Sequence, residues 1–437
     1  MKSFKNEDVL KNKVGKIGFL SVVSIGIGGM IGGGIFAVLG LAVQLAKGGT
    51  PTAFALAGVI ALITSYSYAR LSITYPCQGG TVEFLNQAFG TGIFTGSLNI
   101  LLWLSYVVML SLYSYAFGSY AASFFGNSLF FKHVFITGII LLMTLLNFFG
   151  SKAVGEAEEG IVAFKVAILF LFVMAGLWSV KVGRLMPNEW GHPIKLISGG
   201  MIIFLAYEGF ELIANTAGDV DKLEKLPLAY YTAVVFVIFT YIMVAIVTVG
   251  NLPYDQIVQA KDYALAAAAK PFLGSMGFVL IAIAALLSTT SAINATLYGS
   301  ARVSYIIAKE GELPEELERK VWNEPIEGLL ITTIMSLLMA NLLNLSSISI
   351  MGSAGFLLIF ACVNLANVKL HNKTKSNRLI PLLGAIMCFI ALTVLVLQTA
   401  MFNPENLLVL AIMVGVSFLI ELLYRMITKR EIKAYFS

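Results

Sequence analysis

Charged side chains are scarce in this sequence. Asp, Glu, Lys and Arg make up 12% of the residues, whereas a typical soluble protein has about 25%. Hydrophobic residues make up 58%, and the mean hydropathy is +0.87. This composition excludes a soluble globular protein. Apolar segments of about 20 residues can cross a lipid bilayer, so we expect an all-α integral membrane protein.

Cysteine and catalytic motifs are also scarce. The three cysteines, Cys77, Cys362 and Cys388, lie in or beside apolar segments and lack the spacing of metal ligands or of a disulfide framework. We therefore expect no metal and no cofactor. The sequence contains no HExxH, GxSxG or nucleotide-binding loop, which argues against an intramembrane enzyme. No basic run is interleaved with aromatic residues, which argues against nucleic acid as a partner.

The apolar residues are arranged in twelve segments that are long enough to span a bilayer. These segments are 17–46, 53–75, 93–123, 133–150, 158–180, 197–217, 228–250, 275–308, 328–346, 349–369, 379–400 and 405–425. Most of the 29 basic residues lie in alternate loops, on the side of the N-terminal tail. Positive residues favour the cytoplasmic side, so we expect a multi-pass protein of the cell membrane with both termini in the cytoplasm. The charged N-terminal tail lacks a compact apolar core, and we expect no cleaved signal peptide.

The first apolar segment contains the stretch GIGGMIGGGIF at residues 26–36. Six of these eleven residues are glycines, and each glycine costs a helix about 1 kcal/mol relative to alanine. We therefore expect a discontinuous helix, which a membrane tolerates where the freed backbone lines a cavity or is buried in protein. The alternative is that the glycines serve close helix packing, but packing does not require three consecutive glycines.

The sixth segment contains a second interruption, FLAYEGFELIANTAG at residues 204–218. Glu208, Gly209 and Glu211 lie in the middle of this apolar run, where a charge costs roughly 2.5–3.5 kcal/mol. The two interruptions are five segments apart. Interrupted segments at matching places in two halves of a chain are typical of the binding site of a secondary transporter.

Three motifs resemble those of the amino acid–polyamine–organocation transporter family. They are GGMIGGGIF in the first segment, FLAYEGFE in the sixth, and STTSAINATLYGSARVSYIIAKEGELP in the eighth. The resemblance implies a LeuT-type 5+5 inverted-repeat core over residues 17–370, with discontinuous helices 1 and 6. It further implies a cytoplasmic tail at 1–16, and helices 11 and 12 with a C-terminal tail at 371–437. The family usually has a glutamate after helix 6, where this chain has Gly218, with Asp219 as the neighbouring acid.

A broken helix at mid-membrane suits the two groups that every amino acid shares. The N–H groups at the start of the outer half-helix lie at the positive end of its dipole, where they can bind a carboxylate. Carbonyl groups beside the two interruptions can accept from the ammonium. The residues expected at this substrate site are Met30, Ile31, Gly32, Gly33, Gly34, Leu205 and Ala206 from the backbone, and Tyr207, Glu208 and Phe210 from the side chains. For Tyr207 and Phe210, ordinary packing is the alternative.

Lys165 lies roughly 10 Å along the fifth segment, at 1.5 Å per residue, among apolar neighbours. Snorkelling to the surface is one alternative. The other is a role in proton coupling, because removal from water favours the neutral form of an amine. The resemblance implies that this amine occupies the place of the sodium ion in sodium-driven relatives, with the Gly28 carbonyl and the Ser288 hydroxyl as its partners.

The two glutamates of the sixth segment have different expected roles. We expect Glu211 to cap the inner half-helix, where a carboxylate satisfies free N–H groups. Glu208 can instead favour cationic groups in the substrate pocket.

Taken together, the sequence and the resemblance predict a proton-coupled secondary transporter that carries amino acids by sodium-independent symport and alternating access. Its partners are the amino-acid substrate, protons and the lipid bilayer. Three alternatives remain open. An amino-acid exchanger and a polyamine or organic-cation transporter would use the same fold, and a transport-silent sensor would keep the same helix interruptions.

Overall fold

The structure is a computed structural model, and it describes residues 17–77, 79–148, 152–309, 311, 313, 317 and 325–428. Within these residues the chain is helical, without a β-strand. Two isolated bridges pair Ile17 with Val220 and Lys47 with Trp190. The predicted N-terminal tail at 1–16 and the last residues of the predicted C-terminal tail, 429–437, lie outside the described residues.

The chain forms sixteen α-helices and seven short or extended 3-10 helices in the described part. The α-helices are α1 (Phe19–Met30), α2 (Gly34–Ala46), α3 (Thr50–Thr74), α4 (Thr81–Phe89), α5 (Ile93–Ala122), α6 (Leu129–Phe148), α7 (Lys152–Gly176), α8 (Pro193–Phe204), α9 (Leu226–Asn251), α10 (Tyr254–Gln259), α11 (Ala264–Lys309), α12 (Ile326–Leu342), α13 (Leu345–Lys369), α14 (His371–Thr374), α15 (Leu379–Phe402) and α16 (Pro404–Thr428). The 3-10 helices are η1 (Ser123–Phe125), η2 (Leu177–Ser179), η3 (Val182–Leu185), η4 (Pro187–Glu189), η5 (Leu205–Asp219), η6 (Leu223–Lys225) and η7 (Lys261–Tyr263).

Each of the twelve predicted segments corresponds to a helix or to a pair of consecutive helices. Ten helical spans in the described residues are long and apolar enough to cross a membrane, and the bent pair α1–α2 makes eleven. The exception is α12, which has 17 residues. At 1.5 Å per residue it is about 25 Å long, shorter than the bilayer core of about 30 Å. The membrane-type helical architecture is confirmed, and length and composition support up to eleven crossings.

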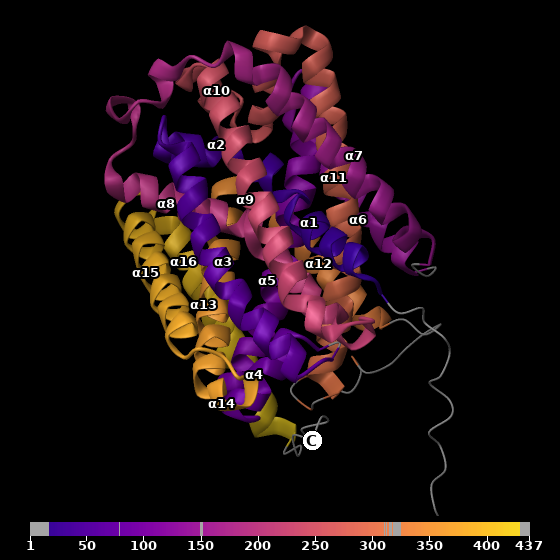
Figure 1. The fold of residues 1–437 in the computed structure, drawn as a ribbon. Coiled ribbons are helices and arrows are strands. Elements are labelled where there is room, and N and C mark those ends of the chain that lie inside the picture. The colour runs from indigo at the N-terminus through magenta and orange to yellow at the C-terminus, as the bar shows by residue number, and fades with distance from the viewer. Residues whose placement is uncertain are drawn as a thin grey trace, which may run out of the picture.

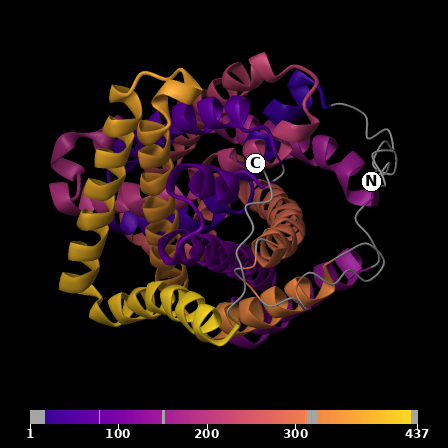
Figure 2. The ribbon, with the colours of Figure 1, turned by 90° about the horizontal axis from the view of Figure 1, so that it is seen from below.

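Three long helical segments form the interior of the bundle. In the most apolar part of α5, of α8 with η5, and of α13, 89% of the residues are buried, against 22% in α16. α5 packs against α6, α11, α12, α13 and α16. Seen from below, α15 and α16 lie at the edge of the bundle (Figure 2). Exposed apolar helices are typical of contact with lipid, so α15 and α16 lie at the periphery, while α5, α8 with η5, and α13 lie inside.

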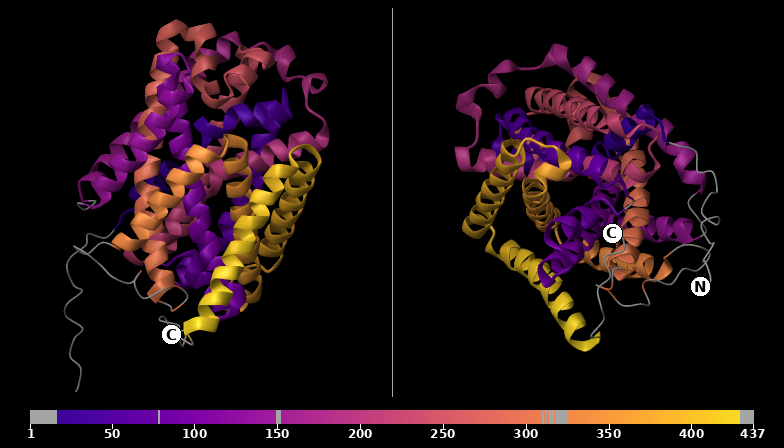
Figure 3. Two further views of the ribbon diagram at one scale, coloured as in Figure 1. Left: turned by 180° about the vertical axis from the view of Figure 1, so that it is seen from behind. Right: turned by 60° about the horizontal axis from the view of Figure 1, so that its bottom comes forward.

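The two ends of the bundle are distinct. α4, α14 and the last turns of α16 lie at one end, whereas α10 lies at the other (Figures 1 and 3). The long helix α11 includes a kink at Gly274, where φ is 65°. That left-handed conformation suits glycine, so the kink separates the short helical piece beginning at Ala264 from the membrane helix that follows.

Candidate functional site

The first apolar segment is broken at the predicted place. α1 ends at Met30, α2 begins at Gly34, and the two helices are bent by 43°. The N–H groups of Gly32 and Gly33 donate no hydrogen bond to any residue that the structure describes. No side chain caps the start of α2. This turn therefore presents two free donors at the positive end of a helix, which is an arrangement that binds anions.

The glycines of this segment also serve close packing. A Cβ atom on Gly33 would lie 2.2 Å from Cδ1 of Tyr113 in α5, so the tyrosine ring lies directly on this glycine. A Cβ atom on Gly209 would lie 2.2 Å from the backbone carbon of Gly29. The close approach of α1 to η5 depends on Gly29 and Gly209. Both interpretations of the glycine stretch thus hold, since the turn is confined to residues 31–33 and the flanking glycines allow close contacts.

The second interruption differs from the prediction. α-Helical geometry ends at Phe204, and the chain continues as the 3-10 helix η5 over Leu205–Asp219, with Leu205 still in the right-handed helical region. The interruption of the α-helix thus takes the form of a 3-10 stretch and not of an open turn like the one in the first segment. A single glycine at 209 does not open the helix as three consecutive glycines do in the first segment. A 3-10 stretch inside a helical span is a common feature of functional hinges.

The carbonyl groups beside the two interruptions are held by two hydroxyl groups. The Tyr241 hydroxyl, from α9, donates to the Met30 carbonyl at 2.5 Å and lies 3.2 Å from the Ala206 carbonyl. The Ser288 hydroxyl, from α11, donates to the Ile31 carbonyl at 2.8 Å and to the Gly32 carbonyl. Two hydroxyls therefore contact three of the four carbonyls that the sequence assigned to a substrate ammonium, those of Met30, Ile31 and Ala206.

Tyr241 was missed by the sequence analysis. It lies in an apolar segment that contains several tyrosines, and nothing in that pattern distinguishes it. Only the fold shows that its hydroxyl joins α1 to η5.

Lys165 is completely buried in α7, with 0% of its surface exposed. Its ammonium donates to the Gly28 carbonyl at 2.8 Å. The snorkelling alternative is therefore wrong, because the side chain points to α1 and not to the surface. Ser288 contacts the next carbonyls of the same segment. Lys165 and Ser288 together bind the end of α1 from two neighbouring helices.

Tyr207 and Phe210 are both buried in aromatic packing. The Tyr207 hydroxyl donates to the Phe54 carbonyl at 3.1 Å, and its ring lies 5.1 Å from that of Tyr241. The Phe210 ring lies 5.4 Å from Tyr68, in a separate aromatic group. In this conformation, both side chains therefore make the packing contacts of the alternative interpretation.

The two glutamates of η5 face different partners. The Tyr113 hydroxyl donates to Glu208 at 3.3 Å. The Thr81 hydroxyl, from α4, donates to Glu211 at 2.7 Å. The capping role expected for Glu211 was wrong, because η5 continues through this point and offers no new helix start there. Glu211 instead joins η5 to α4.

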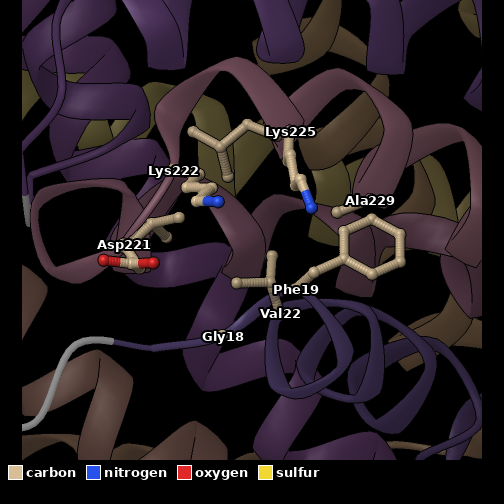
Figure 4. A pocket seen from close by; sticks show the side chains of 9 residues that line it. Gly18, Phe19, Val22, Asp221, Lys222, Lys225 and Ala229 are labelled. Carbon is tan, nitrogen blue, oxygen red and sulfur yellow. The ribbon is translucent and has the colours of Figure 1, made fainter.

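A cavity of about 170 Å³ lies where α1 and α9 begin (Figure 4). Lys222, Lys225 and the first residues of α1 line it. Beside it, the Ile17 N–H donates to the Asp219 carbonyl at 2.9 Å, and the Asp221 N–H donates to the Ile17 carbonyl at 3.1 Å. The segment in which the sequence departs from the family pattern thus binds the start of α1 through its backbone.

These features define a class of protein. Many apolar helices surround a broken helix with free donors, a buried lysine and buried carboxylates, and such polar groups inside a membrane bundle mark a pathway for a solute or an ion. The family model described as amino acid permease matches residues 17–419. The chain belongs to the amino acid permease family.

Three relatives cover most of the chain. The protein MJ0609 of Methanocaldococcus jannaschii is 38% identical over 96% of this chain and 97% of its own length. The inner membrane transport protein YbaT of Escherichia coli is 34% identical over 86% of this chain and 88% of its own length. The methylthioribose transporter of Bacillus subtilis is 26% identical over 80% of this chain and 79% of its own length. The chain is thus similar to named transporters over 86% and 80% of its length, which supports transport of amino acids or related solutes and points away from an enzyme.

Proposed function

We propose that this protein is a proton-coupled, sodium-independent symporter that moves amino acids across the cell membrane by alternating access. The family and its transporter relatives support a transported solute. The observation that carries the proposal is the turn at residues 31–33, where two free N–H groups lie beside carbonyls from two helices. Backbone N–H donors and carbonyl acceptors in one place match an α-amino acid, which carries a carboxylate and an ammonium on the same carbon atom.

Substrate binding follows from this arrangement. The substrate carboxylate accepts from the N–H groups of Gly32 and Gly33, and Gly34 begins the helix whose dipole attracts it. The ammonium donates to the carbonyls of Met30 and Ala206. A carbonyl oxygen has two lone pairs, so each can accept from the ammonium while Tyr241 remains bound. Ile31 and Leu205 complete the backbone of the site.

Proton coupling rests on Lys165. Its ammonium holds the Gly28 carbonyl two residues before α1 ends, so the charged form ties α7 to α1. Loss of the proton removes one positive charge and weakens that tie, since hydrogen bonds from charged donors are the stronger kind. α1 is then freer to move, and substrate leaves on the side where the proton left. The same ammonium makes a sodium ion at this point unnecessary.

The proposal includes a membrane arrangement of twelve helices, with α12 as a short crossing and with two repeats of five helices at the core. The end of the bundle that carries α4 and α14 faces the cytoplasm, because most basic residues flank that side. Opening on this side requires release of the Ile17–Val220 bridge, which binds the start of α1.

Uptake by purified protein in proteoliposomes tests the substrate class. A competition panel should contain neutral and cationic α-amino acids, amines without a carboxylate, and methylthioribose. We expect every effective competitor to carry both a carboxylate and an ammonium. Inhibition by amines alone would replace the proposal with polyamine transport, and inhibition by methylthioribose alone would remove the amino acid from it.

A further inference from the structure

Among the buried glutamates in the described part of the chain, Glu208 accepts the longest hydrogen bond. Four glutamates there are at least nine-tenths buried, and Glu208 has 6% of its surface exposed. Its single hydrogen bond is the one from Tyr113, at 3.3 Å, and it forms no ion pair with a described residue. The other three accept from closer partners: Glu83 from Gln87, Glu211 from Thr81 and Glu421 from Arg425.

An incompletely satisfied carboxylate is costly inside a membrane protein. Burial of a charge is unfavourable unless a partner of opposite charge or several hydrogen bonds compensate for it. The buried cation Lys165 is engaged with Gly28 on α1. Within the described residues, the protein therefore places no positive charge in an ion pair with Glu208.

Tyr113 contacts both Glu208 and the glycine turn that carries the free N–H donors. Its ring lies against Gly33, and its hydroxyl, at the far end of the ring, donates to Glu208. A substrate whose carboxylate binds at Gly32 and Gly33, and whose side chain runs along Tyr113, thus brings the end of that side chain to Glu208.

We propose that Glu208 is the receptor for a second positive charge on the substrate, and that the protein selects α-amino acids with a terminal amine over uncharged ones of the same length. This inference rests on the proposed function. It gives Glu208 a role in specificity, while the backbone of residues 30–34 binds the groups that all α-amino acids share. Tyr113 is the positioning residue, because its hydroxyl orients the carboxylate.

The test compares uptake of lysine and norleucine, whose carbon chains are equal and which differ in the terminal amine. We expect wild-type protein to favour lysine in kcat/KM by about 30-fold, since removal of one partner of a buried charge pair costs at least about that factor. Glu208→Gln should remove this preference by weakening lysine uptake, with norleucine changed by less than about three-fold. Tyr113→Phe keeps the ring and should lower the preference part of the way.

Glu211→Gln is the matched control, because it removes a neighbouring carboxylate whose partner is Thr81. It should keep the wild-type ratio of lysine to norleucine. Thermal stabilisation by each amino acid, measured on the purified variants, keeps the test valid for a variant that binds but transports slowly. In Glu208→Gln we expect lysine to lose its stabilising effect, while norleucine keeps its effect.

Two results would overturn this inference by itself. One is norleucine uptake with no lysine preference in wild type, and the other is an equal loss of both substrates in Glu208→Gln, which would place Glu208 at the shared ammonium. Absence of saturable uptake of any amino acid by wild-type protein would overturn the proposed function, and the inference with it.

Discussion

In the first apolar segment the backbone leaves helical geometry between Met30 and Gly34, whereas in the sixth it continues from Phe204 as a 3-10 helix. The first region therefore offers free N–H donors, and the second offers the Ala206 carbonyl and the Glu208 carboxylate. The two interruptions therefore complement each other in charge. One region suits the negative end of a zwitterion and the other suits its positive groups.

The donor region, which we define as residues 31–34, should be most sensitive to substitution at Gly33. We expect Gly33→Val to lower amino-acid uptake by about 100-fold or more, because a Cβ atom at this position would lie 2.2 Å from the Tyr113 ring. A 100-fold loss corresponds to only about 2.8 kcal/mol of binding free energy. Gly138→Val in the exposed part of α6 is the control, since a Cβ atom there meets nothing within 4 Å. Normal uptake by a monodisperse Gly33→Val protein would show that the site lies elsewhere.

The acceptor region, which we define as residues 205–211 of η5, is joined to α4 through Glu211. Thr81→Val removes the hydroxyl that donates to this buried carboxylate at 2.7 Å. Leaving a buried charged group without its donor costs about 1.5–3 kcal/mol, so the melting temperature should fall by several degrees. Thr393→Val, at an exposed position of α15 where the hydroxyl bonds only its own helix, should leave it nearly unchanged. An equal fall in both variants would argue against the anchoring role.

The link between the two regions is the Tyr241 hydroxyl. Tyr241→Phe keeps the ring and removes the bonds to the Met30 and Ala206 carbonyls. A neutral hydrogen bond contributes about 1 kcal/mol, so the loss of thermal stability should be smaller than in Thr81→Val. Faster hydrogen exchange should appear at residues 30–34 and 205–209 together. Exchange that rises in only one of these stretches would show that the hydroxyl does not join them.

Much of this architecture follows from local sequence features. Three consecutive glycines at 32–34 cannot continue a helix at low cost, so the first interruption was predictable. For the isolated Lys165 the sequence left both snorkelling and an internal partner open, and only the fold decides between them. The form of the second interruption was not predictable in this way. One glycine between two glutamates is compatible with a gap or with a 3-10 helix. The structure has the 3-10 helix, with Gly209 packed against the backbone of Gly29. The role of Tyr241 depends on which carbonyls the fold brings to it.

Proton coupling through Lys165 can be tested by comparing uptake driven by a proton gradient and by a sodium gradient in proteoliposomes of wild-type and Lys165→Ala protein. We expect wild-type uptake to follow the proton gradient and to ignore sodium. Lys165→Ala should fold, because an apolar residue is less costly than a charge in a membrane span, but it should lose the pH dependence and gain no response to sodium. Lys270→Ala, in the short helical piece before the α11 kink, should behave as wild type. Sodium-dependent uptake by the wild type, or unchanged pH dependence in Lys165→Ala, would contradict proton coupling through Lys165.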